Sequence, residues 1–152
     1  DPSCVKSRTG YLIAVANCPI MWISKLQPTI CTSTMHAEYT ALSQVMKDVI
    51  PLRELCKGVY RAVGLPEKVI TSFKTTCHQD NNGALTLANM PPGQTTPASK
   101  FYAIRLHWFR SLLKPNCIVV VRCPTEIQQA DILTKALPGP RFKEMRKLVC
   151  GW

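Results

Sequence analysis

The sequence predicts an α/β fold, one domain in which a mixed β-sheet is flanked by helices. Two observations carry this prediction. The chain has 152 residues, of which 46% are hydrophobic, and this is enough to bury one compact core. Short runs of β-forming residues come first, and stretches with helical spacing then alternate with further strand-like runs. Because no repeat or change of composition divides the chain, residues 1–152 are expected to form a single domain.

Four stretches are predicted to be strands. The apolar runs Tyr11 to Cys18 and Ile20 to Ser24 meet around the turn-forming residues Asn17 to Pro19, which favours a hairpin. Val69 to Gln79 is expected to be the third strand, ending just before a carboxylate. Cys117 to Arg122 is an unbroken run of mainly β-branched residues, a pattern typical of a strand that is buried on both faces.

The helices are predicted from apolar spacing and from capping residues. Ser33 is a good N-cap for a helix whose apolar residues recur at intervals of three and four. Pro51 is expected to end that helix and to begin a second one, which runs to Val63 and is closed by Gly64. Further helices are expected over Asn82 to Asn89, Lys100 to Leu113, Pro124 to Leu133 and Arg141 to Val149, with a loop over Pro91 to Pro97.

The charge of the chain is strongly one-sided. Lys and Arg number 19 against 9 Asp and Glu, which gives a formal net charge of +10 and a pI near 9.4. This balance favours a polyanionic partner such as nucleic acid, and the alternative is a basic surface that only keeps the protein in solution. No membrane partner is expected, because the apolar run from Tyr11 to Ile23 is too short to span a bilayer and contains Asn17 and Pro19.

Eight cysteines are scattered along the chain without a CxxC pair. Most have apolar neighbours, which predicts reduced, buried thiols in an intracellular protein, in a cytoplasmic particle or the nucleus. Those with apolar neighbours are Cys18, Cys31, Cys56, Cys117 and Cys150. Cys77 and His78 could form half of a zinc site, but no second ligand pair accompanies them, so core thiols are favoured. The chain shows no signal peptide and begins with Asp1 rather than Met, so we expect a processed product or an excised piece.

Three carboxylates stand at informative positions in a chain that has few acids. Glu38 lies on the apolar side of its helix, Asp80 follows a strand where α/β sites usually gather, and Asp131 follows the last strand. Taken singly, Glu38 could pair with a Lys or Arg, Asp80 could cap the next helix, and Asp131 could be a surface acid. Together they stand where a sheet could bring them close, and clustered carboxylates usually imply bound divalent cations. Two Mg²⁺ ions about 4 Å apart would activate a water and stabilise the leaving oxygen in phosphodiester cleavage.

Five motifs then follow one another in an order that is shared with a known family. They are Ser7 to Tyr11, Ser33 to Leu42, Asp80 to Ala84, Lys100 to Arg110 and Ala130 to Pro138. They resemble the ribonuclease H (RNase H) domain that ends copia-type retrotransposon polyproteins, and the match covers nearly the whole chain. The resemblance implies a five-stranded mixed sheet with flanking helices, and metal-dependent cleavage of the RNA strand of an RNA–DNA hybrid during reverse transcription.

The resemblance also assigns roles to residues. It implies that Glu38, Asp80 and Asp131 are the catalytic carboxylates and the ligands of Mg²⁺ or Mn²⁺. Basic residues would hold the phosphates of the nucleic acid, where charge gives affinity without sequence choice. The expected contacts are Lys100, Arg105, His107, Arg110, Lys114 and Lys135, although His107 could instead pack its helix.

The chain departs from the family pattern in three respects. Phe101 and Ala103 stand where copia elements usually have His and Asp, and His36 stands where many relatives have Glu. The resemblance further implies a first strand whose Asp is shared by both metal ions, and that segment would lie upstream of Asp1. We therefore expect little or no two-metal catalysis from this chain alone, and a sheet whose open edge needs another partner.

Two functions stay open at this point. One is an RNase H-type endonuclease domain of a retrotransposon polyprotein, here truncated. The other is a retrotransposon-derived domain without nuclease activity that binds nucleic acid, or that binds a protein through the open sheet edge.

Overall fold

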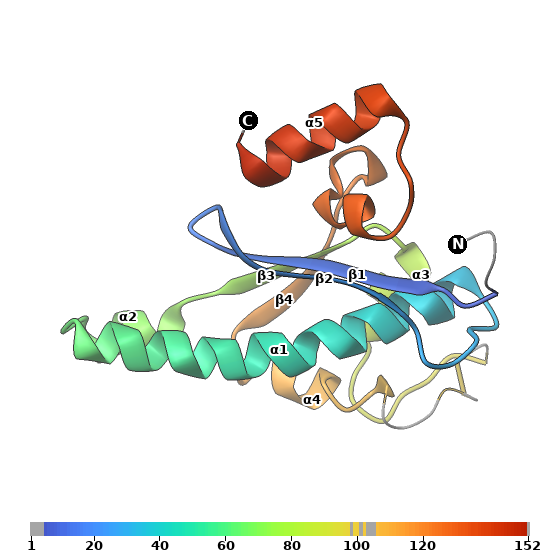
Figure 1. Ribbon diagram of the computed structural model, residues 1–152. Helices are drawn as coiled ribbons and strands as arrows, with labels where there is room; N and C mark the ends of the chain where they lie inside the picture. The colour runs from blue at the N-terminus through green and yellow to red at the C-terminus, as the bar shows by residue number, and fades with distance from the viewer. Residues whose placement is uncertain (1–4, 98, 101, 103–105, 152) are drawn as a thin grey trace.

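A computed structural model of the chain describes residues 5–97, 99–100, 102 and 106–151. These residues form two small sheets, one long helix and several short helices (Figure 1). The α/β fold class predicted from the sequence is confirmed. The single mixed sheet of five strands is not found in the described part of the chain, where two separate two-stranded sheets are present instead.

The first sheet is the predicted antiparallel hairpin of β1 (Arg8–Val15) and β2 (Cys18–Leu26). Its turn consists of Ala16 and Asn17, both with positive φ, as the favoured two-residue hairpin turns require. The prediction placed the turn too far along the chain, because Pro19 lies within β2. The missing N–H of Pro19 is tolerated there, since the residue pairs with Ala14 at an irregularity of the register.

The second sheet consists of β3 (Thr75–Gln79) and β4 (Ile118–Arg122), which pair in parallel. The third strand is shorter than predicted, because Glu67–Ser72 forms the short helix α2 after Pro66. The strand predicted over Cys117 to Arg122 is confirmed as β4, but burial on both faces is not, because Ile118 and Val120 are buried whereas Val119 and Val121 are half-buried. Within the described residues no hydrogen-bonded strand joins the two sheets, so each strand keeps one unpaired edge.

Helix α1 (Thr34–Ala62) is longer than the sequence predicts. It begins as expected at Ser33, whose hydroxyl accepts a hydrogen bond from the backbone N–H of His36 at 3.1 Å. The predicted break at Pro51 is wrong, because the helix continues through it. Pro51 lies on the exposed side, where water can satisfy the carbonyl that loses its partner. The predicted stop at Gly64 is confirmed by its φ of +79°.

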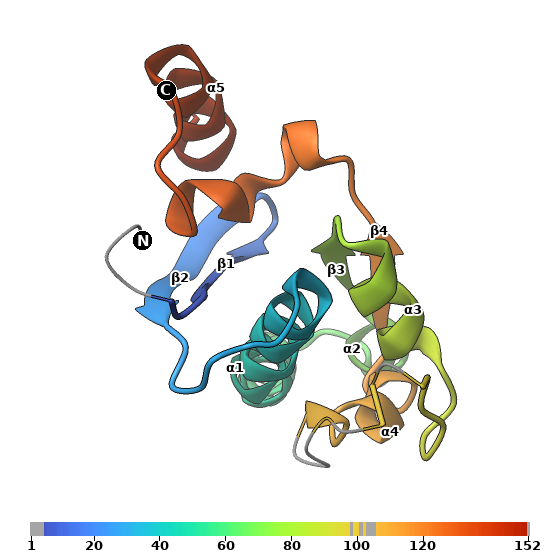
Figure 2. The same ribbon diagram turned by 90° about the vertical axis from the view of Figure 1, so that its right-hand side faces the viewer.

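Helix α1 also ties the two sheets together. Toward the hairpin, the hydroxyl of Tyr11 donates to the carboxylate of Asp48. Toward β3, the guanidinium of Arg53 donates to the carbonyl oxygen of Phe73 at 2.8 Å and to the hydroxyl of Thr75. Figure 2 shows α1 running beneath both sheets. The buried residues around it include Tyr39, Leu42, Met46, Leu87, Phe109 and Val120.

The remaining helices agree with the sequence in part. Helices α3 (Asn82–Asn89) and α5 (Gly139–Cys150) are confirmed. The helix predicted from Pro124 is instead two 3₁₀ turns, η2 (Thr125–Ile127) and η3 (Gln129–Leu133), which the extended backbone of Gln128 separates.

The helix predicted over residues 100–113 is only partly observed. Its described α-helical part is α4 (Arg110–Leu113). Phe101, Ala103 and Arg105 lie outside the described residues. The predicted loop near Pro91 is confirmed, since residues 91–97 contain turns but neither helix nor strand.

The cysteines are more exposed than the sequence predicts. The seven described cysteines are all free thiols. Among these seven, Cys123 alone is buried, whereas Cys18 and Cys150 are exposed because they stand at the start of β2 and the end of α5. No described helix combines the length and the apolar content that a membrane span requires.

Candidate active site

The three carboxylates singled out in the sequence come from three separate elements. Glu38 lies in the second turn of α1, Asp80 directly follows β3, and Asp131 lies in η3. The backbone N–H of Cys123 donates to the carbonyl oxygen of Gln79 at 2.9 Å, so the chain leaves β3 and β4 side by side. From there it runs through η2 to η3, which packs against β1. The path of the chain thus returns Asp131 to the neighbourhood of the other two carboxylates.

The electrostatic environment of Glu38 reflects this proximity. Burial raises the pKa of Glu38 above its ordinary value, and the negative charges of Asp80 and Asp131 raise it further. A hydrogen bond with Gln79 and the positive charge of Lys135 act in the opposite direction, but the pKa stays raised. Like charges shift a pKa only at short range. The structure therefore places both Asp80 and Asp131 within electrostatic reach of Glu38.

Each of the other two carboxylates has its own polar partner. The hydroxyl of Thr125 donates to Oδ2 of Asp80 at 3.1 Å. The Nζ atom of Lys135 lies 2.7 Å from Oδ2 of Asp131, whose side chain is only 14% exposed. Asp131 is therefore not the surface acid that one reading of the sequence allowed.

Asp80 is also not the N-cap of α3. That role belongs to Asn81, whose side-chain oxygen accepts from the backbone N–H of Ala84 at 3.0 Å. The backbone N–H of Asn81 in turn donates to Oε1 of Gln79 at 2.9 Å. This bond occupies the amide oxygen of Gln79 and leaves its amide nitrogen to donate to Glu38. The residues next to Asp80 thus cap the helix and orient Glu38, so Asp80 serves neither purpose and bonds with Thr125 instead.

A glycine permits the close packing of η3 on the hairpin. A Cβ atom at Gly10 would lie 2.5 Å from Cγ2 of Thr134 and 3.0 Å from Cβ of Leu133, too close for any larger residue. The hydroxyl of Ser24 on the neighbouring strand donates to the carbonyl oxygen of Leu133 at 2.6 Å. These contacts fix the end of η3, and with it Asp131, against β1.

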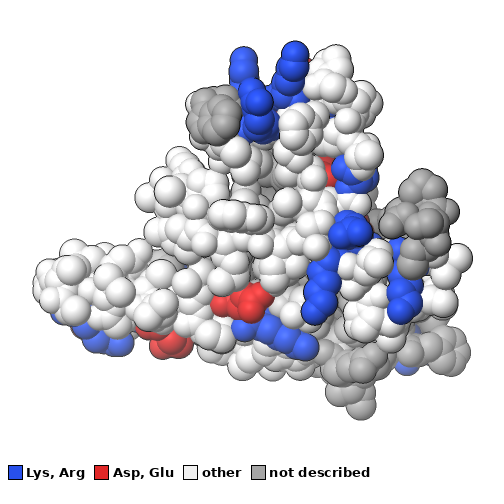
Figure 3. Space-filling view, viewed as in Figure 1, with Lys and Arg blue, Asp and Glu red and all other residues white. Residues whose placement is uncertain are grey.

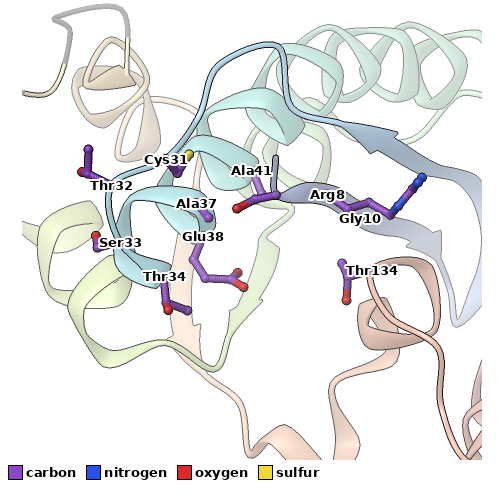
Figure 4. Close-up of a pocket in the computed structure, with 11 residues that line it drawn as sticks. Arg8, Gly10, Cys31, Thr32, Ser33, Thr34, Ala37, Glu38, Ala41 and Thr134 are labelled. Atoms are coloured by element: carbon purple, nitrogen blue, oxygen red, sulfur yellow. The ribbon is translucent and has the colours of Figure 1, made fainter. Parts of the chain in front are cut away.

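A cavity of about 400 Å³ opens beside Glu38. Its walls come from the start of β1, the segment before α1, the first turns of α1 and the residue that follows η3. Figure 4 shows Glu38 and Thr134 projecting into this space from opposite sides. Asp80 and Asp131 do not line the cavity, which therefore meets the carboxylate group only at Glu38.

The three carboxylates match Mg²⁺ or Mn²⁺ in their chemistry but not in their arrangement. Carboxylate oxygens are the ligands that Mg²⁺ and Mn²⁺ prefer, so the donor chemistry fits. The arrangement does not, because among the described residues no three His, Cys, Asp or Glu side chains converge closely enough to hold one metal ion. Lys135 neutralises Asp131 instead. The described part of this chain does not form a metal site by itself.

The expected nucleic-acid contacts do not form one surface. Lys135 lies among the carboxylates. Lys114 is exposed near the start of β4, at the end of that strand away from the carboxylates. Lys100 is exposed, and Arg105 lies outside the described residues.

Two of these six expected contacts turn inward. Arg110 is buried, and its guanidinium donates to the carbonyl oxygens of Leu87 and Gln94 at 3.1 and 2.8 Å. Nδ1 of His107 lies 3.0 Å from the hydroxyl of Tyr39. Burial lowers the pKa of His107, and the positive charge of Arg110 lowers it further. Both side chains hold the α4 region in place and do not present a cation to a phosphate.

Sequence reasoning missed two residues that act on the carboxylates. Gln79 and Thr125 contact Glu38 and Asp80, yet neither belongs to a recognisable pattern. The available signal was position, because each stands at the end of a strand or at the start of the segment that follows one. Polar residues at the ends of strands can therefore bind the acids beside them, as Gln79 and Thr125 do here.

Known proteins resemble this chain over nearly its whole length. Over 144 residues, 95% of its length, it is 31% identical to the "Retrovirus-related Pol polyprotein from transposon TNT 1-94" of Nicotiana tabacum. It is 27% identical over 143 residues to the Pol polyprotein from transposon RE2, and 27% over 137 residues to that from transposon RE1, both of Arabidopsis thaliana. These matches cover 94% and 90% of the chain. They support an origin in a retrotransposon Pol polyprotein.

The chain spans about a tenth of the length of these Pol polyproteins, namely 10%, 9% and 9%. No protein family model matches it, and no solved structure matches it either. The similarity therefore identifies the kind of polyprotein, and the activity of this segment has to be argued from its site.

Proposed function

We propose that this chain belongs to an RNase H-like domain of a copia-type reverse transcriptase, which cleaves the RNA strand of RNA–DNA hybrids. The observation that carries the proposal is that Glu38 lies within electrostatic reach of Asp80 and Asp131, although the three acids come from distant segments. Gathering partly buried like charges costs free energy, and such groups are concentrated at functional sites. The similarity to Pol polyproteins supports the same assignment.

The arrangement of the two sheets is consistent with the proposal. In Figure 2, β1 is the strand of the first sheet that lies nearer to the second sheet, and β3 is the strand of the second sheet that lies nearer to the first. Helix α1 runs beneath both sheets. Each of these two strands has an edge of backbone groups without a partner strand in the described part of the chain, and such edges favour pairing with a further strand. One extended segment between β1 and β3 would join the two sheets into the five-stranded sheet that the resemblance implies.

We propose Mg²⁺ or Mn²⁺ as the cofactor of the completed domain. The resemblance implies a fourth carboxylate on the additional strand, which would add a ligand beside Glu38 and Asp80. Without it the three acids do not converge on one ion, and Lys135 compensates Asp131. The chain on its own is therefore expected to bind these metals weakly and to cleave little or no hybrid.

A cleavage assay tests this proposal. The substrate is an RNA–DNA hybrid labelled on the RNA strand, with Mg²⁺ or Mn²⁺. Two forms are compared: the chain alone, and the chain fused to the residues that precede the matched segment in the tobacco polyprotein. We expect cleavage by the fusion, a loss of at least about 100-fold on Asp80→Asn within it, and little cleavage by the chain alone.

Glu54→Gln is the matched control, because it also neutralises one acid. Glu54 is exposed on α1, where it pairs with Lys57, and the change should leave cleavage intact. A folded fusion that binds the hybrid but does not cleave it would contradict the nuclease proposal.

The second candidate is a binding module without nuclease activity. The observation that favours it is that the acids of the described chain do not converge on a metal. The open edges of β1 and β3 could then take an extended segment of a partner protein by strand addition. Hybrid binding without cleavage by any of the forms above would favour this function.

A further inference from the structure

Helix α5 (Gly139–Cys150) carries more basic than acidic side chains. It carries four basic side chains and one acid, Glu144, which pairs with Arg141 at 3.4 Å. Lys143 and Lys147 are exposed, and no described residue forms an ion pair with either. Figure 3 shows Lys and Arg side chains gathered over α5 at the top of the molecule. An excess of positive charge on one helix favours an anionic partner.

The helix is fixed to the segment that carries the carboxylate site. The guanidinium of Arg141 donates to the carbonyl oxygen of Thr125 at 3.2 Å, which anchors α5 on η2. The side-chain amide of Gln129 donates to the carbonyl oxygen of Leu148 at 3.3 Å, which anchors it on η3. Met145 is buried at 1% exposure and packs the inner side of the helix. Thr125 also binds Asp80, so α5 is positioned relative to the carboxylates and not independently of them.

The two exposed lysines are spaced to act together. Lys143 and Lys147 are four residues apart, so their Cβ atoms lie about 5–6 Å from each other on one face of the helix. Long flexible ammonium side chains at this spacing can contact neighbouring phosphates of one strand. We infer that Lys143 and Lys147 form a binding surface for the phosphate backbone of nucleic acid, next to the carboxylate site. This inference rests on the proposed function for the identity of the polyanion.

An anionic lipid surface is the competing partner. Phe142 and Leu148 are 43% and 49% exposed, and a helix with basic and apolar side chains can lie on a membrane. Nucleic acid is favoured, because the anchors on η2 and η3 place α5 beside the segment that carries Asp131. Thr125 links the helix to the site directly, because its hydroxyl donates to Asp80 and its carbonyl oxygen accepts from Arg141.

Binding of an RNA–DNA hybrid at several salt concentrations tests the inference. The measurement is made with EDTA, so that it does not depend on cleavage, and compares the chain with the double variant Lys143→Ala, Lys147→Ala. The control is Lys47→Ala, Lys68→Ala, which removes two exposed lysines from α1 and α2 and lowers the net charge equally. We expect the slope of log K against log salt to fall by about 2 in the α5 variant and to stay unchanged in the control.

Equal losses in the two variants, or no loss in the α5 variant, would overturn the inference. The same variants are tested for binding to vesicles that contain phosphatidylserine. Loss of vesicle binding with unchanged hybrid binding would assign α5 to lipid and would also overturn it. Cleavage by the fusion with an unchanged salt slope would reject this surface alone. A reduced slope without any cleavage would retain the surface and reject the nuclease function.

Discussion

Replacing Gly10 by Ala tests how the segment that carries Asp131 is held. The added Cβ would lie 2.5 Å from Cγ2 of Thr134 and 3.1 Å from the backbone carbonyl carbon of Leu133. The side chain of Thr134 can rotate, but the backbone at Leu133 can move only if η3 shifts on β1. Overpacking of this kind costs about 1–3 kcal/mol. We therefore expect Gly10→Ala to lower the free energy of unfolding by about 2 kcal/mol, within that range.

The assay is urea unfolding followed by circular dichroism, with Gly58→Ala as the control. Gly58 lies inside α1 with nothing within 4 Å of its would-be Cβ, so alanine should stabilise the helix by about 0.5–1 kcal/mol. The same chemical change is thus expected to have opposite signs at the two positions. An unchanged or raised free energy of unfolding in Gly10→Ala would refute the packing of η3 against β1.

Three further variants test other parts of the structure. Glu38→Gln should stabilise the protein at neutral pH, because the raised pKa of Glu38 means that its charged form is disfavoured on folding. The gain in stability should vanish below about pH 4.5, where glutamic acid is neutral in both the folded and the unfolded state. A gain that persists at that pH would contradict this cause. Ser33→Ala should cost about 1 kcal/mol by removing the N-cap of α1, as thermal unfolding would show, whereas an unchanged melting temperature would argue against the cap. Arg53→Ala should lower the free energy of unfolding, measured in urea, by roughly 3 kcal/mol, because two hydrogen bonds and the contact with the ring of Phe73 are lost together. A loss below about 1 kcal/mol would contradict that explanation.

The sequence predicted those elements that local chemistry determines. The N-cap at Ser33 and the stop at Gly64 depend on a few neighbouring residues, and both are confirmed. Pro51 was misjudged because its cost depends on whether its side of the helix is buried, which only the tertiary structure determines. The helix expected after Pro124 is instead a pair of 3₁₀ turns, and η3 packs against Gly10 of a strand more than 100 residues earlier in the chain, a contact that local sequence does not reveal.

The site could be predicted as a set of residues but not as a geometry. The acids Glu38, Asp80 and Asp131 were visible from their positions, and the structure places both Asp80 and Asp131 within electrostatic reach of Glu38. Composition alone could not tell which basic residues face solvent. Arg110 has the charge of a phosphate contact, but it is buried against backbone carbonyls. Lys143 belongs to no recognisable motif, although it is exposed on a helix anchored beside the site.

The most direct test of the account is an NMR titration of the Glu38 side-chain carboxyl. The central claim is that Glu38, Asp80 and Asp131 share one electrostatic environment. The account predicts a pKa for Glu38 above its ordinary value in the unmodified chain, and a lower pKa in both Asp80→Asn and Asp131→Asn. An ordinary pKa that neither substitution changes would show that the three carboxylates do not meet, and would remove the basis for the proposed nuclease site.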